Sequence, residues 1–316
     1  MDDAVSLLRN GGLVAFPTET VYGLGAVCFN ELAVARVFEL KQRPRFDPLI
    51  VHVAEPSDLP MVVEGEIPAY ADKLIESFWP GPLTLVLPRS VRIPEIVSAG
   101  LGTVAIRCPD FALSRELIRR VGSPLAAPSA NRFGKISPTT AAHVRESFGD
   151  DCPLVLDGGA CRVGVESTVV DCMQTVPRLL RPGGVTVEEL ECVIGEIQRT
   201  GGAPQQMVSP GMLKSHYAPS TPLEIVVERP SAEQLGKGRS GLLCYCDPKD
   251  TVLESAEGFV AVAILSKTGD LREAAARLFA SLRELDALGL DRIYALQVPA
   301  EGLGLAIADR LQRAAS

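Results

Sequence analysis

The residues with the clearest chemical potential are three cations that fall close together in the sequence. Lys41, Arg43 and Arg45 occupy alternate positions within the run KQRPR. Ammonium and guanidinium groups match the oxygens of phosphates, so a cluster of them suits a polyanion. Basic residues in the last turn of a helix also complement its dipole, and for any one cation alone a solvated helix end is the better interpretation.

A hydroxyl-rich turn precedes these cations and strengthens the polyanion interpretation. The segment 16–25, FPTETVYGLG, carries three hydroxyl side chains followed by Gly23 and Gly25. Glycine lacks a Cβ atom, which lets a backbone approach a bound group closely. Because the turn and the cations lie on adjacent predicted elements, we interpret the whole run as one binding segment.

The elements that hold these residues follow from proline and capping signals. Residues 13–16 predict a short strand, which ends at a proline because proline cannot donate to a sheet ladder. Asn30 suits the N-cap of a helix over 31–40, and a further proline marks the end of that helix. The apolar run 49–53 predicts a second strand, which carries His52.

Composition indicates an ordinary globular protein of two domains. The chain has 316 residues, of which 47% are apolar and 22% charged, and its formal net charge is −8. That length exceeds the usual size of one hydrophobic core, and the acidic balance disfavours a general nucleic-acid coat. It is compatible with a local basic cavity, which four further cations could join: Arg107, Arg132, Lys135 and Arg181.

Cysteine, histidine and hydropathy patterns exclude other classes of protein. The eight cysteines contain no Cys-x-x-Cys pair and the three histidines lack metal-ligand spacing, which favours buried reduced thiols over zinc sites or disulfides. No apolar run approaches the ~20 residues that span a bilayer, and the acidic start lacks the basic residues of a signal peptide. We therefore expect a soluble, cytoplasmic protein without a membrane partner.

The chain divides at a segment rich in glycine, proline and serine. Residues 1–199 alternate strands and helices irregularly, which predicts a twisted, mixed sheet. Residues 200–222 show no helical or strand period and predict a linker. Residues 223–316 alternate more regularly, with an amphipathic helix over 270–288, and predict a smaller Rossmann-like domain of parallel strands. The fold class is therefore α/β, and the second domain lacks the glycine fingerprint of a dinucleotide site.

Several familiar catalytic signatures are missing from the sequence. It has no P-loop, no Gly-x-Ser-x-Gly elbow and no His-Glu-x-x-His. If ATP binds, another kind of cradle holds it, and we expect any catalysis to proceed without a nucleophile from the protein.

Several separated motifs carry a family resemblance: PTETVYGLG, KQRP, PLIVH, AAPSAN and SPGMLKSHYAP. Together they resemble the two-domain Sua5 type of the YrdC/Sua5 family of threonylcarbamoyl-AMP synthases, over nearly the whole chain. The resemblance implies a YrdC-like catalytic domain over 1–199, a linker or lid over 200–222 and a Sua5-type C-terminal domain over 223–316. It also implies a nucleotidyltransferase that condenses L-threonine, bicarbonate and ATP to threonylcarbamoyl-AMP and pyrophosphate.

The same resemblance assigns the site residue by residue. The L-threonine pocket would consist of Thr20, His52, Arg107, Ala127 and Ser167. The ATP site, with Lys41 and Arg43 as its most sensitive catalytic positions, would consist of Lys41, Arg43, Asp47, Thr103, Ser129, Asn131, Ser137, Arg181 and Tyr217. Arg107 suits the carboxylate of threonine because its planar fork pairs with two oxygens. Seen alone, His52 would instead be a satisfied core histidine, and Arg181 could equally be a charge on a surface loop.

Asp47 departs from the family pattern, which has asparagine at this position, and its role stays open between contact with Mg²⁺ and contact with the ribose. Mg²⁺ is expected with ATP, held by phosphate oxygens and water more than by carboxylates. Residues 209–219 predict a lid that brings Tyr217 to ATP, or else a plain interdomain tether. The expected partners are ATP, L-threonine, bicarbonate, the downstream tRNA threonylcarbamoyl-transfer machinery and, weakly, tRNA itself.

Two other functions compete with this interpretation. The first is an RNA-binding maturation module without turnover, which the acidic charge and the lack of interleaved aromatic residues disfavour. The second is a carbamoyl-transfer enzyme that uses a carbamoyl-adenylate, for which the sequence shows no accessory domains.

Overall fold

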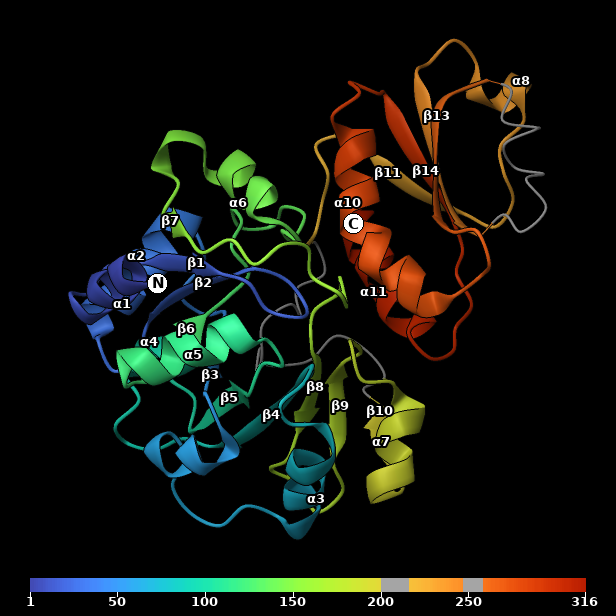
Figure 1. Cartoon of the computed structure of the whole chain (residues 1–316). Coiled ribbons are helices and arrows are strands. Elements are labelled where there is room, and N and C mark those ends of the chain that lie inside the picture. Colours follow the sequence, from blue (N-terminus) through green and yellow to red (C-terminus); the bar gives the residue numbers. More distant parts are fainter. Residues whose placement is uncertain (200–215, 247–257) are drawn as a thin grey trace. The chain divides into compact units, whose positions relative to one another are not determined.

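The computed structural model describes residues 1–199, 216–246 and 258–316 (Figure 1). Within them the chain groups into two compact units. The first holds residues 1–133, 137–162 and 166–199, and the second holds 134–136, 163–165 and the residues from 216 onward. Most of the linker predicted over 200–222 lies outside the described residues, so the predicted domain limits stay predictions.

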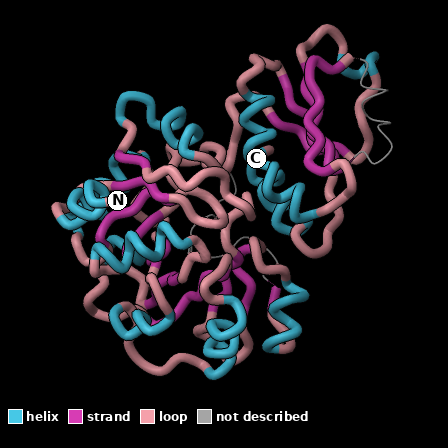
Figure 2. The backbone as a smooth tube through the Cα atoms, in the orientation of Figure 1, coloured by secondary structure: helices cyan, strands magenta, loops and turns pink. Residues whose placement is uncertain are grey.

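The first unit is built on one ten-stranded sheet that mixes parallel and antiparallel pairs, which confirms the predicted mixed sheet (Figure 2). Its strand order is β10-β9-β8-β4-β5-β3-β6-β2-β1-β7. The strands are β1 (Val14–Phe16), β2 (Gly23–Val27), β3 (Ile50–His52), β4 (Leu83–Pro88), β5 (Thr103–Arg107), β6 (Leu125–Ala127), β7 (Leu154–Val155), β8 (Thr168–Asp171), β9 (Arg178–Arg181) and β10 (Gln198–Arg199).

Two helices of the first unit, α2 and α6, begin at residues whose side chains cap them, and the sequence predicted Asn30 as one of these caps. Asn30 accepts a hydrogen bond from the backbone N–H of Ala33 at the start of α2, and Thr140 caps α6 in the same way. The helices are α1 (Asp2–Arg9), α2 (Glu31–Lys41), η1 (Pro56–Met61), α3 (Ala69–Phe78), α4 (Glu95–Ser98), α5 (Ala112–Val121), α6 (Ala141–Phe148), η2 (Gly149–Asp151) and α7 (Val187–Ile194).

Helices α1 and α5 pack against each other and against strands β1 and β6. Their apolar residues recur at helical spacing, so each helix buries one face. Leu8 of α1 and Leu117 of α5 are fully buried in this cluster, as is Phe16 of β1. A second apolar cluster spans strands β3, β4, β5, β8 and β9. The two clusters fix the strands whose ends carry the predicted site.

Strand β2 corrects the interpretation of the glycine-rich turn. The segment from Gly23 to Val27 forms a strand, antiparallel to β1 and β6. A Cβ atom on Gly25 would lie 2.7 Å from the ring of Phe16, closer than side-chain packing allows. The glycines therefore make room for a core phenylalanine, and the expectation that they let a ligand approach stays a prediction.

The second unit is a four-stranded, fully parallel sheet, as its regular β–α alternation predicted. Helices α10 and α11 pack against each other and against this sheet (Figures 1 and 2). Asp270 caps α10 by accepting from two backbone N–H groups. The elements are β11 (Leu223–Val226), α8 (Ala232–Leu235), β12 (Ser240–Cys246), β13 (Phe259–Ser266), α10 (Leu271–Asp286), β14 (Arg292–Leu296) and α11 (Gly304–Ala314).

Candidate active site

Strand register in the first unit brings the predicted threonine residues together. Strands β3 and β5 run parallel with His52 opposite Arg107, and β6 runs antiparallel with Ala127 opposite Ile50. Strand β4 pairs with both β5 and β8, which places Ser167, just before β8, near the same end of the sheet. Residues far apart in the chain thus reach one region because the sheet order interleaves them.

Arg107 is buried at the end of β5 and meets a carboxylate that the sequence analysis did not assign. Its Nη2 lies 2.6 Å from Oε1 of Glu19, and the exposed fractions of the two side chains are 4% and 0%. We call these two residues the Arg107–Glu19 pair. Arg107 Nη1 donates to the hydroxyl of Thr20 at 2.7 Å, and Nε donates to the carbonyl of Gly81.

His52 is buried beside this pair as a neutral imidazole. Burial, reinforced by the charge of Arg107, lowers the pKa of His52 to about 3. Its Nδ1 lies 3.2 Å from the carbonyl oxygen of Ile50, and its ring packs edge-on against Phe16. A buried histidine without a carboxylate partner favours the uncharged form. His52 is thus a packed core residue whose ring contacts the backbone of Ile50 and Leu125.

Ser167 links the pair's region to Arg181. Its hydroxyl lies 2.7 Å from that of Thr84, and its carbonyl oxygen accepts from Nη2 and Nε of Arg181 at 2.9 and 3.2 Å. Only 2% of Arg181 is exposed. The alternative that Arg181 is a surface loop charge is therefore wrong.

A second group of charges surrounds Asp47. Arg43 Nη2 lies 2.8 Å from Asp47 Oδ2, and Nε of Arg43 donates to the backbone carbonyl of Asp47. Burial raises the pKa of Asp47, while the charges of Arg43, Lys41 and Arg181 oppose that rise. We call these four residues the Asp47 cluster. Its cations outnumber its carboxylate, and Asp47 orients Arg43.

Lys41 joins the end of α2 to the Pro-Ser-Ala-Asn turn that follows β6. Its Nζ donates to the carbonyl oxygens of Ser129, at 2.6 Å, and Asn131. Burial, and secondly the charge of Arg43, lowers the pKa of Lys41 well below its usual value of 10.5. The solvated helix end is thus the wrong interpretation for Lys41 and Arg43, which are buried, whereas Arg45 is exposed.

The remaining predicted ATP residues occupy three places. Thr103 begins β5, at the opposite end of the strand from Arg107, so about 13 Å of chain separates the two residues. Ser137 is buried and donates to Glu166 at 2.5 Å. Tyr217 belongs to the second unit, where its ring stacks on Phe279 with centroids 5.5 Å apart. Contact of any of them with ATP stays a prediction, and the part of the predicted lid over 209–215 lies outside the described residues.

Two further cations, Arg132 and Lys135, were predicted to join the basic cavity. Arg132 pairs with Asp151 at 2.5 Å and donates to the carbonyl of Leu40. Lys135 belongs to the second unit, so the prediction that it joins a basic cavity stays untested.

Sequence reasoning missed three buried polar residues that touch the predicted site: Glu19, Thr84 and Glu166. Glu19 lies inside the PTETVYGLG motif, and Glu166 directly precedes Ser167, so the motifs contained two of them. A charged residue within a stretch of buried residues was the available signal, because carboxylates are seldom buried without a partner. Nothing in the sequence around Thr84 indicated its contact.

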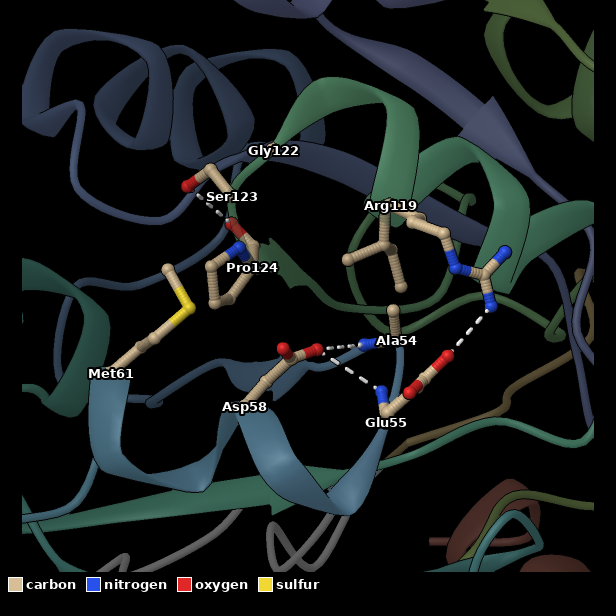
Figure 3. Close-up of a pocket in the computed structure, with 9 residues that line it drawn as sticks. Ala54, Glu55, Asp58, Met61, Arg119, Gly122, Ser123 and Pro124 are labelled. Carbon is tan, nitrogen blue, oxygen red and sulfur yellow. Dashed lines mark hydrogen bonds and ion pairs between the residues drawn. The ribbon is translucent and has the colours of Figure 1, made fainter.

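A hollow of about 380 Å³ lies elsewhere in the first unit, between η1 and the end of α5 (Figure 3). Its lining includes the ion pair between Glu55 and Arg119, whose side chains are each 47% exposed. Asp58 faces it and accepts from the backbone N–H groups of Ala54 and Glu55. The hollow contains no predicted site residue.

Among residues 1–199, 216–246 and 258–316, no group of three or more His, Cys, Asp or Glu side chains could hold a metal ion. No helix there has both the length and the apolar character that a membrane crossing requires.

Fold and site together define a two-unit α/β protein whose larger unit buries two groups of charged residues. Two family models cover nearly the whole chain: Sua5/YciO/YrdC, described as "Telomere recombination", at residues 6–183, and "Threonylcarbamoyl-AMP synthase, C-terminal domain" at residues 185–316. The chain belongs to the Sua5-type, two-domain family of threonylcarbamoyl-AMP synthases.

Individual relatives are similar over almost their full length. The Threonylcarbamoyl-AMP synthase of Pyrococcus abyssi is 45% identical, with 98% of this chain and 92% of the relative covered. That of Bacillus subtilis is 44% identical, with 99% and 92% covered. A crystal structure of P. abyssi Sua5 complexed with L-threonine matches with a TM-score of 0.89 at 42% identity, covering 99% of this chain and 93% of that one.

Proposed function

We propose that this chain is a nucleotidyltransferase that condenses L-threonine, bicarbonate and ATP into threonylcarbamoyl-AMP and pyrophosphate. The observation that carries the proposal is that the first unit contains two buried groups of charged residues with different charge balance. The Arg107–Glu19 pair is balanced and suits an amino acid, whereas the Asp47 cluster has excess positive charge and suits phosphates. The relative solved with L-threonine and the names of the close relatives support the same activity.

The reaction needs positioning more than it needs a nucleophile from the protein. Bicarbonate takes up a proton and loses water to give CO₂, and the amine of threonine loses a proton and adds to this CO₂, which forms a carbamate. A carbamate oxygen then attacks the α-phosphorus of ATP, and pyrophosphate leaves. Both attacking groups belong to substrates, so the protein contributes orientation and stabilisation of developing charge.

In this scheme the threonine pocket consists of Thr20, His52, Arg107, Ala127 and Ser167. Lys41, Arg43 and Arg181 would hold the phosphates. Thr103, Ser129, Asn131, Ser137 and Tyr217 would complete the ATP site, and Asp47 would hold Arg43 in place.

Mg²⁺ would enter with ATP, bound by phosphate oxygens and water. The product would pass to the tRNA threonylcarbamoyl-transfer machinery, because a mixed carboxylic–phosphoric anhydride is an activated acyl donor.

Pyrophosphate release tests the proposal directly. Purified protein is incubated with Mg²⁺, ATP, bicarbonate and L-threonine, and parallel reactions omit one component each. We expect release that requires both L-threonine and bicarbonate. Tight tRNA binding without any threonine-dependent release would instead favour the RNA-binding maturation module.

A further inference from the structure

Glu19 is a buried carboxylate that the proposed reaction leaves without a task. Its exposed fraction is 0%, and it lies next to Thr20 in the predicted threonine pocket. Removing a carboxylate from water is costly unless a cation and well-placed donors replace the lost hydration. The interactions that Glu19 makes within the protein therefore indicate how many of its acceptor positions remain for a ligand.

Arg107 is the cation that Glu19 contacts in the described part of the chain. The 2.6 Å approach of Arg107 Nη2 to Glu19 Oε1 has the distance of an ion pair but lacks the alignment of a hydrogen bond. Within the described residues, neither oxygen of Glu19 accepts a hydrogen bond. An ionised carboxylate offers about four acceptor positions, so Glu19 retains acceptor capacity although it is buried.

Three titratable side chains near the pair are uncharged: His52, Cys108 and Cys161. Burial lowers the pKa of His52 to about 3, so its imidazole is neutral. Burial raises the pKa of the Cys108 and Cys161 thiols to about 12 each, and the charges of Glu19 and Arg107 act on both thiols. The Arg107–Glu19 pair therefore carries one charge of each sign and no net charge.

This balance determines which ligands fit. A simple carboxylate would meet an arginine whose charge is already matched, and would lie beside a second carboxylate. A zwitterionic amino acid brings one charge of each sign and can pair with both residues. We propose that Glu19 binds the α-ammonium group of L-threonine while Arg107 binds its carboxylate. This inference rests on the proposed use of L-threonine.

The competing explanation is that Glu19 only balances the charge of Arg107. Two ligands separate the explanations: L-threonine, and (R)-3-hydroxybutyrate, which keeps the carboxylate, hydroxyl and methyl groups but lacks the amine. Calorimetric titration of the wild-type protein should show L-threonine binding about 30-fold tighter or more, because the analogue leaves Glu19 unpaired. Equal affinities would overturn the proposal without any variant.

Glu19→Gln keeps the shape of the side chain and removes its charge. We expect this variant to bind L-threonine about 30-fold more weakly or worse, and to bind (R)-3-hydroxybutyrate as well as the wild type or better. The matched control is Glu116→Gln, at a half-exposed glutamate paired with Arg119, and it should leave both affinities unchanged. Equal weakening of both ligands in Glu19→Gln, or no change in either, would refute ammonium binding.

The titrations test the ammonium site and the pyrophosphate assay tests the reaction, so either proposal can be refuted without the other. Selective L-threonine binding that depends on Glu19, without pyrophosphate release, would refute the proposed reaction and support the ammonium site. Pyrophosphate release at a normal rate, with an unaltered L-threonine KM in Glu19→Gln, would support the reaction and refute the ammonium site. If Glu19→Gln does not fold, the comparison of the two ligands on wild-type protein decides.

Discussion

The two charge groups of the first unit are buried to a similar degree but balanced differently. Arg107 faces Glu19, so its charge is matched one to one. The Asp47 cluster, by contrast, holds three basic side chains and one carboxylate, and the pKa of Lys41 is lowered because burial and Arg43 disfavour its charge. A balanced pair suits a ligand that carries both signs, whereas a cluster with excess positive charge suits a polyanion.

The comparison also shows how a group of buried basic side chains is stabilised. Buried like charges repel, and each cation of the Asp47 cluster has internal acceptors: Arg43 uses Asp47 and Pro48, Lys41 uses two backbone carbonyls, and Arg181 uses Ser167. Phosphate oxygens would compete with these carbonyl acceptors as stronger, charged ones. Internal acceptors thus hold the three basic side chains in place within the first unit.

The largest expected effect comes from removing the lysine of the Asp47 cluster. Lys41→Met keeps a side chain of similar length but loses the ammonium group that would stabilise phosphate charge. We expect kcat/KM for pyrophosphate release to fall at least about 100-fold. The matched control is Arg45→Met, which changes an exposed cation of the same sequence run and should stay near the wild-type rate. Similar rates in all three proteins would remove Lys41 from the phosphate site.

The next effect concerns the acid stability of the Arg107–Glu19 region. The pKa of His52 is about 3 in the folded protein and 6.5 in its unperturbed state, so the unfolded chain binds a proton first. The stability of the folded protein that depends on the neutral His52 is complete above about pH 6.5. It is lost as pH falls toward 3. Between pH 7 and 5 this loss amounts to about 2 kcal/mol.

His52→Gln should abolish that part of the pH dependence. Urea unfolding at pH 7 and pH 5 would measure it, and the difference between the two pH values should be smaller in the variant by about 2 kcal/mol. An identical pH dependence in both proteins would mean that His52 does not resist protonation in the folded state.

The smallest effect tests the contact between Thr84 and Ser167. Thr84→Val removes a hydroxyl without a large change in shape, and Ser167 keeps its contact with Arg181. We expect unfolding free energy to fall by about 1 kcal/mol, seen as a lower urea midpoint at an unchanged m-value. Thr175→Val, at an exposed threonine, is the control. Equal midpoints for both variants would show that this hydroxyl pair contributes little to stability.

Local signals predicted much of the fold. The strands predicted over 13–16 and 49–53 appear as Val14–Phe16 and Ile50–His52, and Asn30 caps α2 as expected. These elements depend on short-range sequence patterns such as apolar runs and capping residues. Strand β2 was missed because its glycines indicate a turn, and only the distant packing of Phe16 explains them.

The residue types in the sequence indicated only part of the two buried charge groups. The sequence places Arg43 and Asp47 four residues apart, and their ion pair could have been predicted from that spacing. Glu19 and Arg107 are separated by 88 positions, so nothing local links them. Without the fold, a buried ion pair between distant residues cannot be distinguished from two separate surface charges.

The long sequence separations within the site have a consequence for biosynthesis. Lys41 lies 88 residues from Ser129, and Thr20 lies 87 residues from Arg107. Closing such loops costs conformational entropy before the stabilising contacts have formed. Domains rich in non-local contacts therefore fold slowly. On the ribosome, Glu19 and Lys41 emerge long before the partners that neutralise or bind them, so neither charge group can assemble until most of the first unit has been translated.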